Sequence, residues 1–242
     1  LKSGHGQDVH GIENIRKKNF RKLLNRIVKI KSYPKILEIG SGDGFFIEEC
    51  LQLKIPIVGS EASEDSLKSL KKKFGKKTKI LKLSLPEQIE KKINEKFDFI
   101  IFNDVFEHLN NPDDVIVQLK KALKHGGSII INLPSSNGII FRISELMMRF
   151  GFPKFYERLW QKNMSSPHLS YFNKENLDKL FFKHNFYNSQ SGYLDSLSAK
   201  SFDRIKNMYD NNLITFFISI ICFFFAMIQK VLPKDIIFSF FR

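Results

Sequence analysis

Cysteine is scarce in this sequence, since Cys50 and Cys222 are the only two in 242 residues. They lie far apart in apolar stretches and form no Cys-x-x-Cys pair, which argues against a disulfide framework and a zinc site. The N-terminal residues also lack the basic-then-apolar pattern of a secretory signal, although the chain opens at Leu1 rather than Met. These absences predict a reduced, cytoplasmic setting and no bound metal.

Acidic residues are outnumbered: 39 Lys and Arg against 25 Asp and Glu give a formal net charge of +14. Two explanations stay open. One is a compositional bias of the genome, and the other is a basic surface selected for anionic partners such as acidic lipid head groups, nucleic acid or phosphorylated sugars. The chain is long enough to build one full α/β domain with a sizeable core.

Short apolar runs alternate with helical patterns between residues 34 and 133. Gly, Pro or polar residues bound these runs, which is typical of strands buried on both faces. The expected strands are 35–40, 55–60, 79–83, 97–103 and 128–133. The clearest helix is 112–124, with Asn111 as its N-cap, Pro112 in its first turn and Gly126 at its end. The alternation predicts an α/β fold, namely a Rossmann-like, doubly wound, mostly parallel sheet with helices on both faces.

Further elements flank this core. We expect a basic amphipathic helix at 12–30, within an N-terminal unit of residues 1–33 that packs on a main domain of residues 34–242. Residues 137–167 are rich in Met and aromatic residues and predict a helical cap, inserted after the fifth strand, that covers the active site. The other expected elements are a helix at 173–185, strands at 186–193 and 236–241, and an apolar helix at 211–232.

A glycine-rich loop, 38–44 (EIGSGDG), separates the first strand from the first helix. Glycines allow a sharp turn and the close approach of a ligand, and the helix N-terminus behind them offers free N–H groups. About twenty residues later, Glu61 ends the second strand, where an acidic side chain can bind both hydroxyls of a ribose. The pattern indicates a nucleoside ligand. The dinucleotide fingerprint would require glycine at Phe45, and a G-x-x-x-x-G-K phosphate loop is absent.

A second motif at 97–109 (FDFIIFNDVFEHL) is followed by 123–127 (LKHGG). The E-x-G-x-G-x-G loop resembles motif I of class I S-adenosylmethionine-dependent methyltransferases. The two later stretches resemble landmarks of the subfamily that includes the ubiquinone O-methyltransferases, similar to methyltransferase domain 23. The resemblance covers roughly residues 14–186 and implies S-adenosylmethionine as the cofactor.

The resemblance also implies roles for individual residues. Glu38 would hold the loop or reach the methionine ammonium, Glu61 would bind the ribose, and Asn103 and Asp104 would lie near the methionine moiety. The family often has an Asp that contacts the adenine amino group. At that position this chain has Ser84 instead, which would make that contact more weakly. The expected cofactor-binding residues are Glu38, Gly40, Ser41, Gly42, Gly44, Glu61, Ser84, Asn103 and Asp104.

Two histidines are candidates for the catalytic base. A hydroxyl acceptor benefits from a base whose pKa lies near the working pH, and His is the usual choice. His108 follows the fourth strand, in the neighbourhood that faces the acceptor in the related quinone methyltransferases, or else it holds its own loop. His168 resembles the H-L-x-x-F landmark of the subfamily. It either points into the acceptor pocket or hydrogen-bonds the turn before Asn173.

Residues 213–228 (LITFFISIICFFFAMI) are apolar around the whole circumference of a helix. A helix of these residues spans about 24 Å, whereas a bilayer crossing needs roughly 20 residues, or about 30 Å. Three interpretations stay open: peripheral contact of 213–232 with the inner face of a membrane, packing in the core or between subunits, and a true span. The basic run 68–82 has Phe74 as its single aromatic residue, so we interpret it as a solvated face and not as a nucleic-acid site.

The sequence thus predicts a methyltransferase that acts, most simply at oxygen, on a small-molecule, saccharide or lipid-linked acceptor. Two alternatives stay open. One is a non-catalytic, cofactor-binding membrane adaptor. The other is an NAD(P)-dependent oxidoreductase, which Phe45 opposes because its fingerprint needs glycine at that position.

Overall fold

The computed structural model describes residues 9–86, 89–196, 220 and 233–242. At its centre is a seven-stranded sheet made of β1 (Ile36–Ile39), β2 (Ile57–Glu61), β3 (Ile80–Lys82), β4 (Phe97–Asn103), β5 (Leu123–Pro134), β6 (Asn188–Leu194) and β7 (Ile236–Phe241). The strand order is β3-β2-β1-β4-β5-β7-β6. The first five strands pair in parallel, and β7 is antiparallel to both of its neighbours. The predicted fold class is confirmed.

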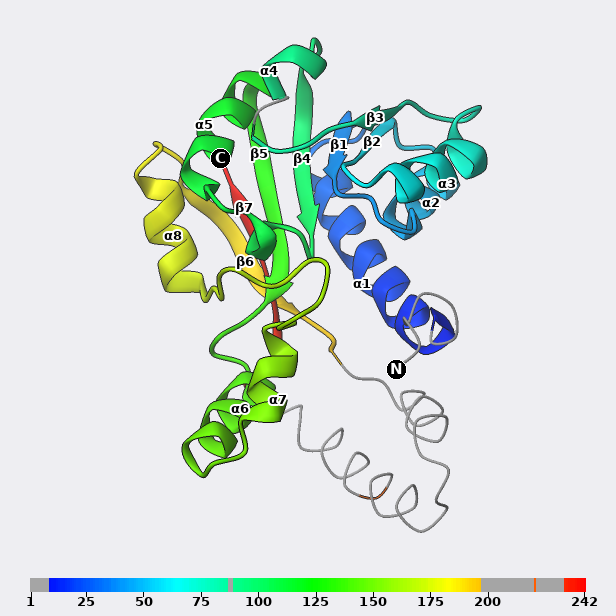
Figure 1. Cartoon of the computed structure of the whole chain (residues 1–242). Coiled ribbons are helices and arrows are strands. Elements are labelled where there is room, and N and C mark those ends of the chain that lie inside the picture. Colours follow the sequence, from blue (N-terminus) through cyan, green and yellow to red (C-terminus); the bar gives the residue numbers. More distant parts are fainter. Residues whose placement is uncertain (1–8, 87–88, 197–219, 221–232) are drawn as a thin grey trace.

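Helices cover both faces of the sheet (Figure 1). They are α1 (Val9–Ile30), α2 (Phe45–Gln52), α3 (Glu64–Phe74), α4 (Ile89–Lys92), α5 (Pro112–Ala122), α6 (Ile139–Arg149), α7 (Pro153–Leu159) and α8 (Lys174–Phe182), with a 3-10 turn at Phe106–His108. The side chains of α1, α2 and α3 form one apolar core, and those of α4, α5 and α8 form the other.

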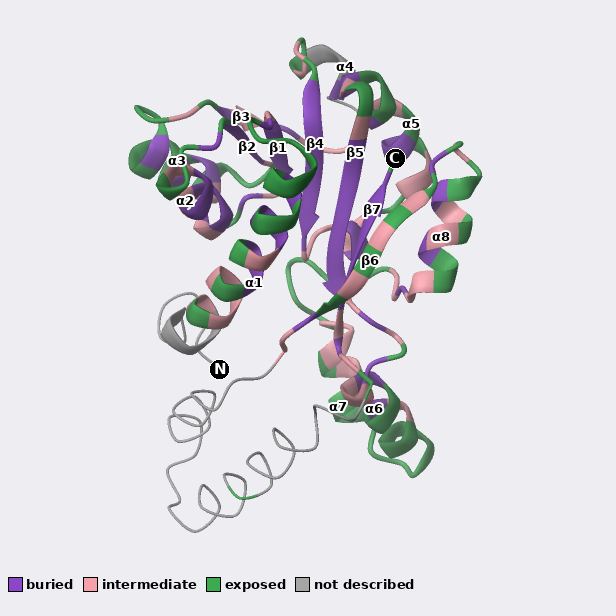
Figure 2. Cartoon of the chain, turned by 180° about the vertical axis from the view of Figure 1, so that it is seen from behind, coloured by how far each residue is buried: buried purple, intermediate pink, exposed green. Residues whose placement is uncertain are grey.

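The strand β4 shows why a mainly apolar run predicts a central strand. All seven of its residues are buried (Figure 2). Phe97, Ile100 and Phe102 belong to one core, whereas Phe99 and Ile101 belong to the other. Because successive side chains point to opposite faces of a sheet, a strand covered on both sides is apolar along most of its length, and the two polar residues of β4 lie at or next to its ends.

The helix α1 confirms the predicted N-terminal amphipathic helix. Phe20, Leu23, Leu24 and Ile27 are buried at the spacing of one helix face. Full burial of each such side chain stabilises the fold by roughly 1.5–3 kcal/mol. This stripe fixes α1 along the sheet, so that its N-terminal half reaches the carboxyl ends of the strands.

The boundary between α5 and β5 differs from the prediction. The helix ends at Ala122, and Leu123 already pairs with Phe97 of β4. Gly126, expected to end the helix, has a φ of 72° and lies within the strand. The register of the pairing shifts at this point, so Gly126 forms part of an irregularity in the strand rather than a helix cap.

Residues 137–167 contain α6 and α7, which project beyond the carboxyl ends of the strands (Figure 1). The predicted apolar helix at 211–232 lies outside the described residues, apart from Ile220. Within the part of the chain that the structure describes, none of the helices is both long and apolar enough to cross a bilayer.

Candidate active site

The glycine-rich loop turns the chain from β1 into α2 at the carboxyl end of the sheet. Gly40, Gly42 and Gly44 have φ angles of 69°, 50° and 78°. Residues with a Cβ rarely adopt this left-handed region. A Cβ on Gly40 would also lie 2.6 Å from Cγ2 of Val105. The loop therefore packs against the segment that follows β4 in a way that only glycine at position 40 permits.

This loop forms one wall of a cleft of about 410 Å³. Seven of the nine predicted cofactor residues line the cleft: Glu38, Gly40, Ser41, Gly42, Glu61, Asn103 and Asp104. The other lining residues include Arg16, Phe20, Leu85, Val105, Leu109 and Ser166, which the sequence motifs did not single out. These predicted residues thus lie together at the carboxyl ends of the parallel strands, as expected for a ligand site in such a sheet.

Two predicted cofactor residues do not line the cleft. A Cβ on Gly44 would lie 2.4 Å from the ring of Phe74, so this glycine lets α3 pack against the loop from behind. Ser84 is also absent from the cleft wall, where its neighbour Leu85 stands instead. Next to β3 the cleft therefore presents an apolar side chain rather than the predicted hydroxyl.

Glu38 lies beneath the loop with 2% of its surface exposed. Its Oε1 accepts a hydrogen bond from Nδ2 of Asn103 at 2.9 Å, and Oδ1 of Asn103 accepts one from Asn132 at 3.2 Å. Its other oxygen, Oε2, is buried without a hydrogen-bond partner. Burial raises the pKa of Glu38 to about 8. An unpaired buried carboxyl oxygen at a cleft wall is suited to receive a cationic group of a ligand.

Glu61 ties the end of β2 to the glycine loop. Its Oε2 accepts a hydrogen bond from the amide of Gly42 at 2.9 Å, and its Oε1 accepts from the amides of Ala62 and Ser63 at 2.9 and 3.1 Å. A carboxylate has about four lone-pair positions, so Glu61 keeps acceptor capacity for a ligand hydroxyl. These bonds hold its carboxylate at the cleft.

Arg16 is a cleft residue that the sequence analysis missed. Its guanidinium lies 3.4 Å from Oδ2 of Asp104, which follows β4 with a φ of 55°. The contact joins residues 88 positions apart in the chain. Arg16 belongs to none of the strand–loop motifs, and the basic character of α1 was the single signal for it.

His108 is the histidine that lines the cleft. Its Nδ1 lies 2.8 Å from the carbonyl oxygen of Pro167. A carbonyl can only accept, so Nδ1 carries the proton in this contact and Nε2 of the neutral ring holds a lone pair. The segment after α7 thereby selects the tautomer of His108 and leaves Nε2 available to accept a proton.

His168 packs behind His108, with 4.7 Å between the ring centroids. Its Nδ1 lies 3.1 Å from the hydroxyl of Tyr171, which itself donates to the carbonyl of Leu159, and its Nε2 lies 3.0 Å from the amide of Gln161. Both ring nitrogens are therefore engaged. Burial lowers the pKa of His168 to about 4. This geometry favours the role of holding the turn over the role of base.

Glu107 lies beside this histidine pair. One oxygen of Glu107 and one nitrogen each of His108 and His168 lie within 4.8 Å of one another, a spacing from which a metal could be bound. Gln161 and Pro167, however, already hold the imidazoles by hydrogen bonds. Burial raises the pKa of Glu107 well above its ordinary range, which favours the neutral acid. The expectation of no bound metal stays a prediction.

The chain is similar to a known protein family. The family model described as a methyltransferase domain matches residues 12–191, most of the chain. The chain belongs to this methyltransferase family. The predicted enzyme class and its cofactor, S-adenosylmethionine, are confirmed for this domain.

Curated relatives of the methyltransferase include two O-methyltransferases. A ubiquinone biosynthesis O-methyltransferase of Pelagibacter ubique is 30% identical over 138 residues, which are 53% of this chain and 56% of the relative. A malonyl-[acyl-carrier protein] O-methyltransferase of Halalkalibacterium halodurans is 28% identical over 147 residues, which are 54% of this chain and 51% of the relative. The match thus spans about half the length of each relative.

Solved structures share the fold of the methyltransferase. A SAM-dependent methyltransferase from Archaeoglobus fulgidus has a TM-score of 0.56 and 15% identity, and the match covers 95% of this chain and 96% of the other. Magnesium protoporphyrin IX methyltransferase from Synechocystis PCC 6803, with bound SAH, has a TM-score of 0.57 and 14% identity, with 81% and 84% covered. At such low identity these similarities concern the fold alone.

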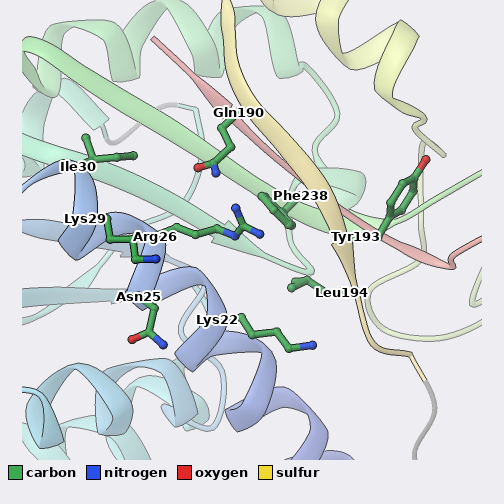
Figure 3. Close-up of a pocket in the computed structure, with 9 residues that line it drawn as sticks. All are labelled: Lys22, Asn25, Arg26, Lys29, Ile30, Gln190, Tyr193, Leu194 and Phe238. Atoms are coloured by element: carbon green, nitrogen blue, oxygen red, sulfur yellow. The ribbon is translucent and has the colours of Figure 1, made fainter. Parts of the chain in front are cut away.

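The methyltransferase has a second described cavity, of about 450 Å³, between α1 and the strands β6 and β7 (Figure 3). Arg26 extends across it and places its guanidinium 4.9 Å from the ring centroid of Phe238. The nine lining residues are Lys22, Asn25, Arg26, Lys29, Ile30, Gln190, Tyr193, Leu194 and Phe238. None of them is His, Cys, Asp or Glu, so this cavity lacks a side chain suited to act as a general base near neutral pH.

The buried Glu38 predicts how the stability of the ligand-free methyltransferase depends on pH. Its pKa rises from an ordinary 4.5 to about 8 on folding, so the folded state keeps a proton that the unfolded chain releases. Its contribution is fully present below pH 4.5 and is lost as the pH rises through 8. We expect urea unfolding to show a free energy of unfolding that falls over this range, and that falls less in Glu38→Gln.

The matched control for this measurement is Glu95→Gln. Hydrogen bonds from Lys35 lower the pKa of Glu95, so this substitution should keep the wild-type fall in stability at neutral and alkaline pH. Identical profiles of the wild type and Glu38→Gln would show that Glu38 does not retain its proton in the folded state.

Proposed function

We propose that the methyltransferase acts on an oxygen atom of a small-molecule, saccharide or lipid-linked acceptor, with His108 as the general base. One observation carries this proposal. His108 lines the cofactor cleft, and its hydrogen bond to Pro167 reserves Nε2 as the proton acceptor. The names of the two O-methyltransferase relatives support transfer to oxygen.

The residues of the cleft fit S-adenosylmethionine. Binding of the cofactor's ammonium group would displace the proton that burial keeps on Glu38, so that Oε2 accepts a hydrogen bond from the ammonium. Glu61 would accept from a ribose hydroxyl. The positive φ at Gly40 and Gly42 keeps the loop free of side chains where the ligand approaches. Arg16 and Asp104, joined across the cleft wall, would border the methionine end.

The cofactor supplies a methyl group on a sulfonium, ready for in-line displacement by a nucleophile. The protein's own contribution is to align the acceptor and to take its proton. In our proposal, Nε2 of His108 accepts the hydroxyl proton as the acceptor oxygen attacks. Burial raises the pKa of Asp104, whereas the charges of Arg16 and of a protonated His108 favour its carboxylate, so the imidazolium and this carboxylate would stabilise each other.

Membrane contact through 213–232, at the inner face of a membrane, is part of this proposal for a lipid-linked acceptor. Those residues lie, apart from Ile220, outside the described part of the chain. Support comes from their apolar composition and from the net charge of +14, which favours acidic lipids.

Calorimetric titration of the protein with S-adenosylmethionine, its demethylated product and NAD tests the cofactor site. We expect the first two to bind and NAD not to bind. Glu61→Ala should weaken both by about 10- to 100-fold, because each hydrogen bond to a charged group contributes about 1.5–3 kcal/mol. The matched control is Glu64→Ala, which removes an exposed carboxylate that pairs with Lys82 outside the cleft. Binding of NAD, or of no ligand, would refute the proposal.

A further inference from the structure

The α6–α7 hairpin carries an unusual concentration of exposed apolar side chains. It projects from the body of the molecule, and most of its residues are exposed (Figure 2). We define the hairpin patch as Leu146, Met147, Met148, Phe150, Phe152 and Phe155, all of which are exposed. Contiguous apolar patches on a protein surface mark sites that contact another apolar phase or partner.

Two phenylalanines, Phe150 and Phe152, are exposed at the tip of the hairpin. Gly151, with a φ of 86°, donates its amide to the carbonyl of Met148, and the amide of Phe152 donates to that of Met147. These two bonds form a Schellman motif, which ends α6 and reverses the chain. Phe150 and Phe152 stand on either side of the glycine and are 72% and 64% exposed. The backbone of this exposed tip is therefore ordered by hydrogen bonds rather than by burial of its side chains.

Basic residues surround the apolar tip. Arg142, Arg149, Lys154 and Arg158 lie on α6 and α7. The acidic residues of the two helices are Glu145 and Glu157, and Glu157 forms an ion pair with Lys162. Apolar side chains flanked by Arg and Lys are the pattern of a segment that lies in a membrane interface, where the apolar groups enter the acyl boundary and the cations meet lipid phosphates.

A mainly apolar cavity lies beside the hairpin patch, with the ion pair of Glu157 and Lys162 in its wall. It has a volume of about 400 Å³ and is lined by Met148 of the patch and also by Tyr156, Trp160, Pro167 and His168. Pro167 in turn accepts the hydrogen bond of His108. An apolar chain that leaves a lipid surface at the patch would thus meet a cavity whose wall includes Pro167, the residue that holds the proposed base. A protein partner docked on the patch would need no such cavity.

We propose that the hairpin patch inserts into the head-group region of an anionic membrane and that the cavity behind it receives the apolar part of a lipid-linked acceptor. The inference deepens the proposed function, on which it rests for the acceptor class. It concerns residues 146–155, and substitutions there can be tested with the sequence of 213–232 unchanged.

The single tryptophan of the chain reports on this inference. Trp160 follows α7 and lines the cavity behind the patch. The full chain is titrated with vesicles of phosphatidylglycerol and phosphatidylcholine, and separately with vesicles of phosphatidylcholine alone. We expect a blue shift of Trp160 fluorescence and quenching by brominated acyl chains, both stronger with the anionic vesicles. The double variant Phe150→Ser/Phe152→Ser should lower partitioning at least about tenfold.

Two further variants sharpen the test. Arg149→Gln/Lys154→Gln should reduce the preference for anionic vesicles by roughly 5-fold per charge. The matched control is Phe182→Ser/Tyr187→Ser, an aromatic pair outside the hairpin in which each residue is 62% exposed, and it should bind like the wild type. Equal partitioning of the tip variant and the wild type would overturn the inference and assign membrane binding to another segment. Absence of any response of Trp160 to vesicles would overturn it as well.

Failure of this inference can be told apart from failure of the proposed function. The tip residues lie outside the cofactor cleft, so Phe150→Ser/Phe152→Ser should keep the wild-type affinity for S-adenosylmethionine. A wild-type protein that binds vesicles but not the cofactor would refute the proposed function alone.

Discussion

Replacement of His108 by alanine is expected to lower kcat for methyl transfer by about 10²- to 10⁴-fold, the usual contribution of a general base. Affinity for S-adenosylmethionine should change little, because the proposed cofactor contacts are Glu38, Glu61 and the loop glycines. Initial rates of methyl transfer, measured with an acceptor that the wild type methylates, give kcat. Calorimetric titration gives the affinity for S-adenosylmethionine. The pH dependence of kcat should lose its acidic limb in the variant, since that limb reports protonation of the base.

Two matched variants complete this test. His125→Ala removes an exposed histidine at the start of β5 and should leave kcat unchanged. His168→Asn should destabilise the turn that holds Tyr171 and Gln161 and lower kcat by less than the His108 substitution. A His108→Ala enzyme with the kcat and the pH profile of the wild type would rule out His108 as the base.

Alanine at Gly40 is expected to damage both the fold and the cofactor site. The left-handed φ of 69° alone costs roughly 1–2 kcal/mol for a residue with a Cβ. The contact of 2.6 Å with Val105 adds overpacking of about 1–3 kcal/mol. We therefore expect urea unfolding to show a loss of about 2–5 kcal/mol, and calorimetry to show weakened binding of S-adenosylmethionine.

Gly42 offers a matched control within the same loop. Its φ is 50°, but a Cβ there would meet no atom within 4 Å, so Gly42→Ala should cost the backbone strain alone. Val105→Ala should partly restore the stability of Gly40→Ala, because it removes the atoms that clash, and a double-mutant cycle measures this coupling. Equal losses of stability for Gly40→Ala and Gly42→Ala would show that the close packing against Val105 does not matter.

The sheet could be predicted because burial on both faces leaves an unambiguous signal in the sequence. The glycine loop and Glu61 were found for a related reason: a nucleoside site at the carboxyl edge needs those residue types at that spacing. The end of α5 was missed, since the pairing of Leu123 with Phe97 depends on a neighbouring strand and not on the local sequence.

The acceptor side could not be resolved from the sequence. The sequence left both His168 and His108 as candidates for the base, and the difference between them lies in the groups beside their rings. The carbonyl of Pro167 is 59 positions from His108 in the chain, whereas Gln161 and Tyr171 engage both nitrogens of His168. Arg16 was missed for the same reason, as its partner Asp104 is 88 residues away.

The strands β6 and β7 have a consequence for how this fold could diversify. Leu194 at the end of β6 is paired with Ile236 at the start of β7, so the intervening stretch leaves and re-enters the sheet at adjacent points. When the two ends of a chain segment are held close together, lengthening that segment costs about 0.6 kcal/mol for each doubling if it is flexible. Related proteins could therefore differ in the length of the sequence between Leu194 and Ile236 while the pairing of β6 with β7 stays the same.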